Sequence, residues 1–214
     1  EIGSGLVGSE MCIRDRYYTS VNRYLQQRFG CKVYKVALSG GFTCPNRDGT
    51  LDSRGCIFCS QGGSGDFAGN PAQSITEQLR RGKAALAGKI KNGKYIAYFQ
   101  SYTGTYAPVE RLRALYTEAL ADPQVVALSV ATRPDCLPPQ VLDLLAKLNR
   151  QKPVFVELGL QTIHRNSAAY IRRGYPLSVF DQAMANLTAI GVNKVVHIIC
   201  LLYTSPSPRD RSLS

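Results

Sequence analysis

The sequence lacks an apolar run long enough to span a bilayer, and it shows no secretory signal. Acidic residues are also scarce, because 15 Asp and Glu stand against 26 Lys and Arg, which gives a formal net charge of +11. We therefore expect a cytoplasmic protein without a membrane partner. The positive charge favours a polyanionic partner such as RNA, or an anionic cofactor, although solubility alone makes many proteins basic.

A regular disulfide framework is also missing. Apart from one cysteine near each end, the chain carries Cys31, Cys44, Cys56, Cys59 and Cys136. An odd and clustered set of cysteines is a poor framework of disulfides and a better set of metal ligands. It therefore indicates a reducing compartment.

The two ends of the chain do not resemble sequence selected for folding. Residues 200–210 read CLLYTSPSPRD, and the opposite strand of DNA that encodes them also encodes LVGSEMCIRD, residues 6–15. Disordered natural termini would explain the Ser and Pro content but not this antisense relation. The shared duplex resembles a sequencing-library adapter, so we interpret residues 1–16 and 200–214 as adapter-derived. Residues 17–199 then form the natural segment, which has the length of one domain.

Short apolar runs alternate with segments of helical spacing along this natural segment. The expected strands span residues 32–38, 94–99, 125–132, 154–160 and 194–199. The expected helices span residues 17–29, 75–88, 109–121, 139–149, 166–174 and 178–191. This alternation predicts an α/β fold with about five βα units on a parallel sheet, either an open doubly wound sheet or part of a barrel. In a barrel the chemistry gathers at the carboxyl ends of the strands.

A long glycine-rich segment, residues 39–71, follows the first expected strand and carries Cys44, Cys56 and Cys59, and we call it the cysteine segment. The C-x-x-C turn sets two thiolates on one ion or cluster, and thiolates select zinc or iron–sulfur centres. A structural zinc ion needs four ligands, so it would recruit Cys31 or Cys136. The spacing alone leaves three interpretations open: a three-cysteine iron–sulfur site, a zinc site and free thiols.

A family resemblance rests on three segments of the chain. They are CPNRDGTLDSRGCIFC at residues 44–59, ATRPDCL at 131–137 and VELGLQTIHRNSAAYIRRGY at 156–175. Together they resemble radical S-adenosylmethionine (SAM) enzymes and, more narrowly, an uncharacterised bacterial family related to the catalytic subunit of Elongator. The eleven residues between the first two cysteines exceed the commonest spacing of the superfamily and match the narrower family. The resemblance covers residues 17–199 and implies a partial (β/α) TIM-like barrel of the radical SAM type, truncated at its carboxyl end.

The resemblance also implies cofactors and partners. Cys44, Cys56 and Cys59 match the cysteines that hold a [4Fe–4S] cluster, whose remaining iron binds SAM. Reductive cleavage of SAM would generate a 5′-deoxyadenosyl radical for an unknown substrate, with a one-electron donor of the flavodoxin or ferredoxin type. The Elongator relative acts on transfer RNA, so an RNA or tRNA substrate is one expectation. The competing class is a zinc-stabilised RNA-binding module without radical chemistry.

Three residues beside the cysteines and the second expected strand match SAM contacts in the family. Phe58 matches an aromatic position near the adenine, and simple core packing is its alternative role. Gln100 and Ser101 match contacts to the methionine amino group.

Three further cofactor contacts are expected near the fourth strand. Glu157 and Gln161 lie four residues apart and should share one face of that strand, where a ribose hydroxyl pair or a nearby cation would satisfy the carboxylate. Arg173 is the candidate for the SAM carboxylate, with Arg172 as the competing choice and a solvated face as the alternative for both. His197, like the other histidine, is expected to be structural. Catalytic residues are not identified from the sequence.

Overall fold

The computed structural model describes residues 18–89 and 93–199, so both ends interpreted as adapter-derived lie outside the described residues. The helices are α2 (Val21–Phe29), α3 (Ile75–Leu86), α4 (Val109–Ala121), α5 (Pro139–Asn149), α6 (Arg165–Tyr170) and α7 (Leu177–Ala189). The strands are β1 (Val33–Leu38), β2 (Lys94–Phe99), β3 (Val125–Thr132), β4 (Val154–Gln161) and β5 (Asn193–Ile198), and short 3-10 turns span Ala87–Lys89 and Pro134–Cys136. In this part of the chain no helix is long and apolar enough to cross a membrane.

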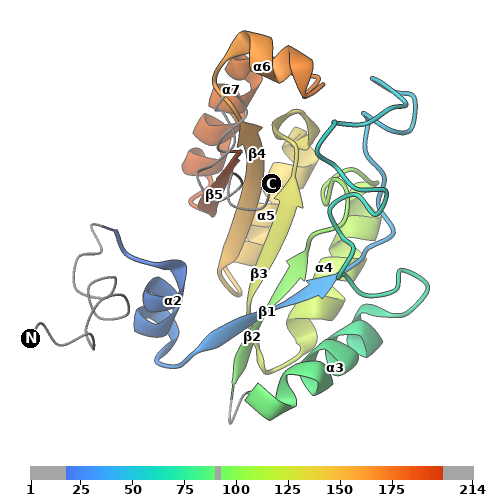
Figure 1. Ribbon diagram of the computed structural model, residues 1–214. Helices are drawn as coiled ribbons and strands as arrows, with labels where there is room; N and C mark the ends of the chain where they lie inside the picture. Colours follow the sequence, from blue (N-terminus) through green and yellow to red (C-terminus); the bar gives the residue numbers. More distant parts are fainter. Residues whose placement is uncertain (1–17, 90–92, 200–214) are drawn as a thin grey trace, which may run out of the picture.

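The five strands form one parallel sheet in the order β1-β2-β3-β4-β5. Each strand pairs with its neighbour in sequence, whereas a doubly wound sheet reverses its strand order at a switch point. Crossovers of one hand that always advance in one direction place their helices on one face of the sheet. Helices α3, α4, α5 and α7 share one apolar core with that face (Figure 1). The fold is therefore a partial (β/α) barrel, as the family resemblance implied.

The opposite, concave face of the sheet is built in two layers. Successive side chains of a strand point to opposite faces, so residues two apart share a face. Near the strand starts, apolar side chains pack against Leu25 of α2, and they are Val33, Ile96, Ala127, Phe155 and Val195. Two residues further along each strand stand Lys35, Tyr98, Ser129, Glu157 and His197, which we call the polar layer. A barrel interior is filled by such layers of side chains.

Local signals explain where the helices differ from their predicted bounds. The predicted helix 17–29 begins only at Val21, because Ser20 caps it by accepting a hydrogen bond from the Arg23 N–H at 3.3 Å. The predicted helix 166–174 ends at Tyr170, because Arg172 and Gly174 adopt positive φ angles of 55° and 84°. The helix therefore gives way to a turn that reaches back toward the cysteine segment.

Candidate functional site

A cavity of about 340 Å³ opens where the carboxyl ends of the strands meet the cysteine segment. Eight of the nine site residues predicted from the sequence line it: Cys44, Cys56, Cys59, Phe58, Gln100, Glu157, Gln161 and Arg173. Further lining comes from residues that include Tyr98, Tyr102, Arg133, Tyr175 and His197. The fold thus brings together side chains from the cysteine segment, from β2, β4 and β5, and from the turn after α6. This is the position at which barrels carry their chemistry.

Ser101 is the predicted site residue that the structure places outside the cavity lining. Its side chain is 5% exposed and lies against the backbone of Gly65, where an added Cβ would come within 2.0 Å of the Ser101 Oγ. The neighbouring Tyr102 donates a hydrogen bond from its hydroxyl to the Gln61 carbonyl at 2.7 Å. Ser101 and Tyr102 therefore both contact the part of the cysteine segment that follows Cys59.

The three cysteines of the segment are free and partly exposed. The Cys56 Sγ accepts a hydrogen bond from the Asn46 side-chain amide at 3.3 Å, and the Cys59 Sγ lies 3.7 Å from the Ser64 hydroxyl. Burial raises the pKa of the Cys56 thiol, and the Asn46 hydrogen bond opposes that effect. Among the described residues, no three His, Cys, Asp or Glu side chains converge closely enough to hold a single metal ion.

The two other candidate ligands lie away from this cavity. Cys31 precedes β1, whereas the cysteine segment follows it, and a strand of six residues spans roughly 20 Å. Cys136 is buried and lines a neighbouring cavity with Pro45 and Asp135. Burial and the Asp135 charge raise the pKa of the Cys136 thiol to about 12. A fourth cysteine ligand from either position is therefore not supported.

The cysteine segment is held at both of its ends by Gln78 of α3. The buried Gln78 side chain accepts from the Ser39 N–H at 2.8 Å and donates to the Ser39 and Gln73 carbonyls, both at 3.0 Å. Arg111 of α4 adds a hydrogen bond to the Gly40 carbonyl at 2.8 Å. Two helices on the outer face thus fix where the long segment leaves β1 and where it leads into α3.

A second anchor lies inside the segment itself. Arg47 donates to the carbonyls of Cys59 and Ser60 at 2.8 and 2.5 Å, so it holds the C-x-x-C turn against the residues that follow Cys44. Gly55 has a φ of +73°, and an added Cβ there would lie 2.8 Å from the Arg47 Nε. Only glycine accommodates both this backbone angle and the passing arginine.

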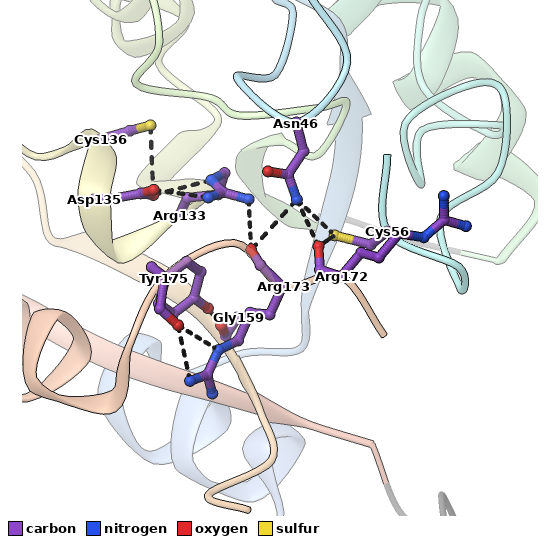
Figure 2. Close-up of polar contacts among 9 residues, drawn as sticks. All are labelled: Asn46, Cys56, Arg133, Asp135, Cys136, Gly159, Arg172, Arg173 and Tyr175. Carbon is purple, nitrogen blue, oxygen red and sulfur yellow. Dashed lines mark hydrogen bonds and ion pairs between the residues drawn. The ribbon is translucent and has the colours of Figure 1, made fainter. Parts of the chain in front are cut away.

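Asn46 joins the segment to the turn after α6 (Figure 2). The Asn46 side chain is 2% exposed, and its amide also donates to the carbonyls of Arg172 at 2.8 Å and Arg173 at 3.3 Å. Arg133 donates to the same Arg173 carbonyl at 3.0 Å. The position of Cys56 is thereby tied to the end of β3 and to the turn after α6. Sequence reasoning missed Asn46, although it lies between the first two cysteines of the motif.

Arg173 lines the cavity, but its guanidinium is engaged by backbone carbonyls. It donates to Tyr175 through two nitrogens at 3.1 and 3.0 Å, and to Leu160 and Thr162 at 2.9 and 2.6 Å. These bonds use four of the five N–H groups that an arginine carries. A bidentate grip on a carboxylate would therefore require some of them to be exchanged. The competing Arg172 is not among the cavity-lining residues.

Tyr175 lies between two guanidinium groups at the wall of the cavity. The Arg133 and Arg173 guanidinium carbons are 5.1 and 4.7 Å from its ring centroid, and its hydroxyl donates to the Gly159 carbonyl. Burial raises the pKa of Tyr175 above its ordinary range. Arg133 also pairs with Asp135 through contacts of 2.9 and 2.7 Å, so this arginine both forms an ion pair within its turn and borders the cavity.

Glu157 is the buried anion of the polar layer. Its Oε1 accepts from the Lys35 ammonium and the Ser129 hydroxyl, and its Oε2 lies 2.8 Å from the His197 Nε2. Burial alone would raise its pKa, yet these hydrogen bonds hold it down at about 2. The cation foreseen from the sequence is therefore present, and the carboxylate is satisfied within the protein.

The carboxyl end of β4 departs from a regular strand. The pairing with β5 shifts register between Gly159 and Gln161, and Gln161 has a φ of 64°. An added Cβ on Gly159 would lie 2.6 Å from the Gln161 side-chain nitrogen. Glycine thus leaves room for the Gln161 amide at the cavity. Phe58, at 41% exposure, also borders the opening and is not part of the core.

The donor set of this cavity fits an iron–sulfur cluster with one open iron. Three thiols of one segment border the same space, and the described residues bring no further thiol to it. Cysteine thiolates are the ligands of such clusters. The remaining lining combines apolar surface with aromatic rings and a few polar side chains, which suits a nucleoside-bearing cofactor beside the cluster.

Comparison with known proteins gives one family. The family model described as the radical SAM superfamily matches residues 44–210. The chain is 48% identical over 185 residues to the uncharacterized protein YtqA of Bacillus subtilis, a match that covers 86% of this chain. It is 42% identical over 176 residues to protein YhcC of Escherichia coli, which covers 82% of this chain. The chain spans 58% and 56% of the lengths of these two relatives.

A solved structure with a similar fold is that of an archaeal protein. Elp3 of the archaeon Methanocaldococcus infernus superposes with a TM-score of 0.53 at 18% identity, over 78% of this chain and 38% of that protein. At this identity the likeness concerns the fold alone.

Proposed function

Since the chain belongs to the radical SAM superfamily, we propose that it holds a [4Fe–4S] cluster on Cys44, Cys56 and Cys59 and cleaves SAM reductively. Members of this superfamily use such a cluster with SAM. One observation carries the assignment of the ligands: the three thiols of one anchored segment border a single cavity at the carboxyl ends of the strands. When bound, the cluster and SAM supply a 5′-deoxyadenosyl radical that abstracts a hydrogen atom from a substrate.

The protein's own contribution is to hold these groups and to orient them. Gln78, Arg47 and Asn46 hold the backbone that carries the three cysteines, so the segment stands at the cavity before a metal binds. Preorganised ligands of this kind keep reacting atoms in place. The proposal therefore assigns the cluster to a rigid frame made by α3, the segment itself and the turn after α6.

We assign SAM to the part of the cavity between the cysteines and the end of β4. Phe58, Gln100 and Gln161 all line this space. Arg173 borders the same space and keeps its proposed role toward the SAM carboxylate. Glu157 contributes through the polar layer, because its carboxylate is already paired.

The partners of the reaction follow from the chemistry of the superfamily and from the charge. The cluster needs a one-electron donor of the flavodoxin or ferredoxin type. The net charge of +11 and the fold shared with Elp3 support a polyanionic RNA substrate for the whole protein.

The direct test measures iron, sulfide and zinc per chain after anaerobic reconstitution, followed by 5′-deoxyadenosine formation from SAM with a chemical reductant. We expect about four irons and four sulfides per chain, as in a [4Fe–4S] cluster. SAM cleavage should depend on that loading. One tightly held zinc ion without sulfide would instead establish a zinc-stabilised module and contradict the proposal.

A further inference from the structure

The polar layer contains a carboxylate–imidazole pair that none of the assigned roles uses. The Glu157 Oε2 and the His197 Nε2 are 2.8 Å apart, across the neighbouring strands β4 and β5. The Glu157 side chain is almost fully buried, whereas 48% of the His197 side chain is exposed. A buried carboxylate that holds one ring nitrogen of an accessible histidine is the arrangement that orients a general acid or base.

The rest of the polar layer keeps Glu157 in its ionised form. The Lys35 ammonium and the Ser129 hydroxyl both bind Oε1, which leaves Oε2 to the imidazole. Tyr98 faces the carboxylate from β2, and its pKa is raised first by burial and then by the Glu157 charge. Tyr98 therefore stays a neutral phenol. The charged or titratable groups that accompany the imidazole in the polar layer are Glu157, Lys35 and Tyr98, and the cavity that it lines also carries the three cysteines, Arg133, Arg173 and Tyr175.

The imidazole faces the same cavity as the three cysteines. His197 lines that cavity together with Cys44, Cys56 and Cys59, whereas Lys35 lines a separate cavity of about 520 Å³ under α2. Within residues 18–89 and 93–199 no hydrogen-bond partner is found for the His197 Nδ1. His197 thus lines the cavity while its Nε2 is held by Glu157, and the described residues leave its Nδ1 without a hydrogen bond.

We propose that His197 exchanges a proton with the substrate through Nδ1, and that Glu157 is the positioning residue that fixes the imidazole for this transfer. The proposal rests on the proposed function, because the substrate would enter the cavity that the cluster and SAM share. It names a chemical class of substrate, namely one that carries an O–H or N–H group beside the reacting carbon.

The proton transfer involves only the substrate, His197 and Glu157. The O–H or N–H bond of the substrate breaks, its electron pair stays on the oxygen or nitrogen, and a new N–H bond forms at Nδ1. The imidazolium that results is stabilised by the Glu157 carboxylate, and no electron is transferred in this step. The reverse transfer returns the proton to the product.

The test of the pair uses nitrogen NMR of the chain labelled at histidine. The chain contains two histidines, His164 and His197, so a His164→Asn variant assigns both. At alkaline pH we expect His197 to hold the single tautomer with its proton on Nε2. In Glu157→Gln, which offers both a donor and an acceptor, the two tautomers should average. Lys35→Gln is the matched control and should retain the wild-type tautomer, because it leaves the Glu157–His197 hydrogen bond intact.

A second experiment records the His197 nitrogen shifts of the reconstituted wild-type chain before and after SAM is added without reductant. It needs no variant, so it tests the proposal even if Glu157→Gln does not fold. The His197 Nδ1 shift should lack the upfield change that marks an accepted hydrogen bond, so that this nitrogen stays open to the substrate. Such a change on SAM binding would assign Nδ1 to the cofactor and overturn the proton transfer, as would an identical tautomer in wild type and Glu157→Gln. A chain that binds no SAM at all would instead overturn the proposed function.

Discussion

At the scale of single residues, the partly exposed Cys56 and the buried Cys136 show how the surroundings of a thiol decide its use. Burial raises the pKa of both Cys56 and Cys136. The Cys56 Sγ accepts a hydrogen bond from the Asn46 amide, whereas Cys136 lies beside the Asp135 carboxylate, whose charge opposes a thiolate. Because the thiolate is the form that binds metal, Cys56 suits a ligand and Cys136 does not.

This contrast predicts the effect of two equivalent substitutions. Cys56→Ala should abolish iron binding, because a three-cysteine site that loses one ligand cannot hold the cluster. Cys136→Ala should retain wild-type iron content, since Cys136 lines the neighbouring cavity. Iron and sulfide are measured per chain after reconstitution of both variants. Wild-type iron in Cys56→Ala would contradict the ligand assignment.

Single residues also mark the limit of what the sequence predicts about the site. The three cysteines could be predicted because they are close in sequence and share one motif. The fixed positions of Asn46 and Arg173 could not, since both bind backbone carbonyls whose location depends on the fold. Every residue type has a backbone carbonyl, so the sequence does not show which carbonyl a side chain will bind. Such contacts therefore require the structure.

At the scale of elements, the turn between α6 and α7 approaches the cysteine segment at a glycine. Gly174 has a φ of +84°, and an added Cβ would lie 2.6 Å from the Asn46 Oδ1 and 3.3 Å from an Arg133 nitrogen. Gly191, after α7, has a similar φ of +70° but no atom within 4 Å of an added Cβ. An alanine would be strained by the backbone angle at both positions. Only at Gly174 would its Cβ also collide with neighbouring side chains.

Gly174→Ala should therefore destabilise the protein more than Gly191→Ala. Backbone strain of this kind costs about 1–3 kcal/mol in both variants. Only Gly174→Ala also displaces Asn46, so it alone should reduce iron uptake. Urea unfolding compares the two free energies, and iron content compares the two sites. Equal stability and equal iron in both variants would show that the turn does not hold the cysteine segment.

The attachment of the cysteine segment to α3 makes a second prediction at this scale. Gln78→Leu removes two buried hydrogen bonds and one part-buried one, and it leaves the Ser39 backbone groups unsatisfied, which costs roughly 1–3 kcal/mol per group. We expect lower stability and faster proteolysis between residues 39 and 71. Gln182→Leu on the exposed face of α7 is the control, because its hydrogen bond joins two exposed side chains. Equal proteolysis of the two variants would mean that Gln78 does not fix the segment.

At the scale of the whole molecule, the sequence predicts the elements well and their assembly only in part. Continuous apolar runs identify the strands, because both faces of each strand are buried. Helical spacing identifies the helices, because only one face of each helix is buried. Those patterns are the same in an open sheet and in a barrel, so the strand order had to come from the family resemblance and then from the structure. The polar layer could not be predicted, since each strand contributes a single polar side chain within an apolar run.

The polar layer joins all five strands, so its central carboxylate should control how stability depends on pH. The folded pKa of Glu157 is about 2, below the ordinary value of 4.5. A carboxyl group with a lowered pKa stabilises the folded state fully above its unfolded pKa and loses that contribution as the pH falls from 4.5 toward 2. The shift corresponds to roughly 3 kcal/mol at neutral pH.

Glu157→Gln should therefore lower the free energy of unfolding at pH 7 by about 3 kcal/mol, because the Lys35 and His197 partners lose their anion. The difference from wild type should shrink between pH 4.5 and pH 3, where the unfolded wild-type chain takes up the proton. Urea unfolding at both pH values measures it. Glu110→Gln is the control, because its exposed ion pair with Arg113 on α4 contributes little at either pH. A difference that stays constant down to pH 3 would mean that Glu157 stabilises the fold through packing and not through its charge.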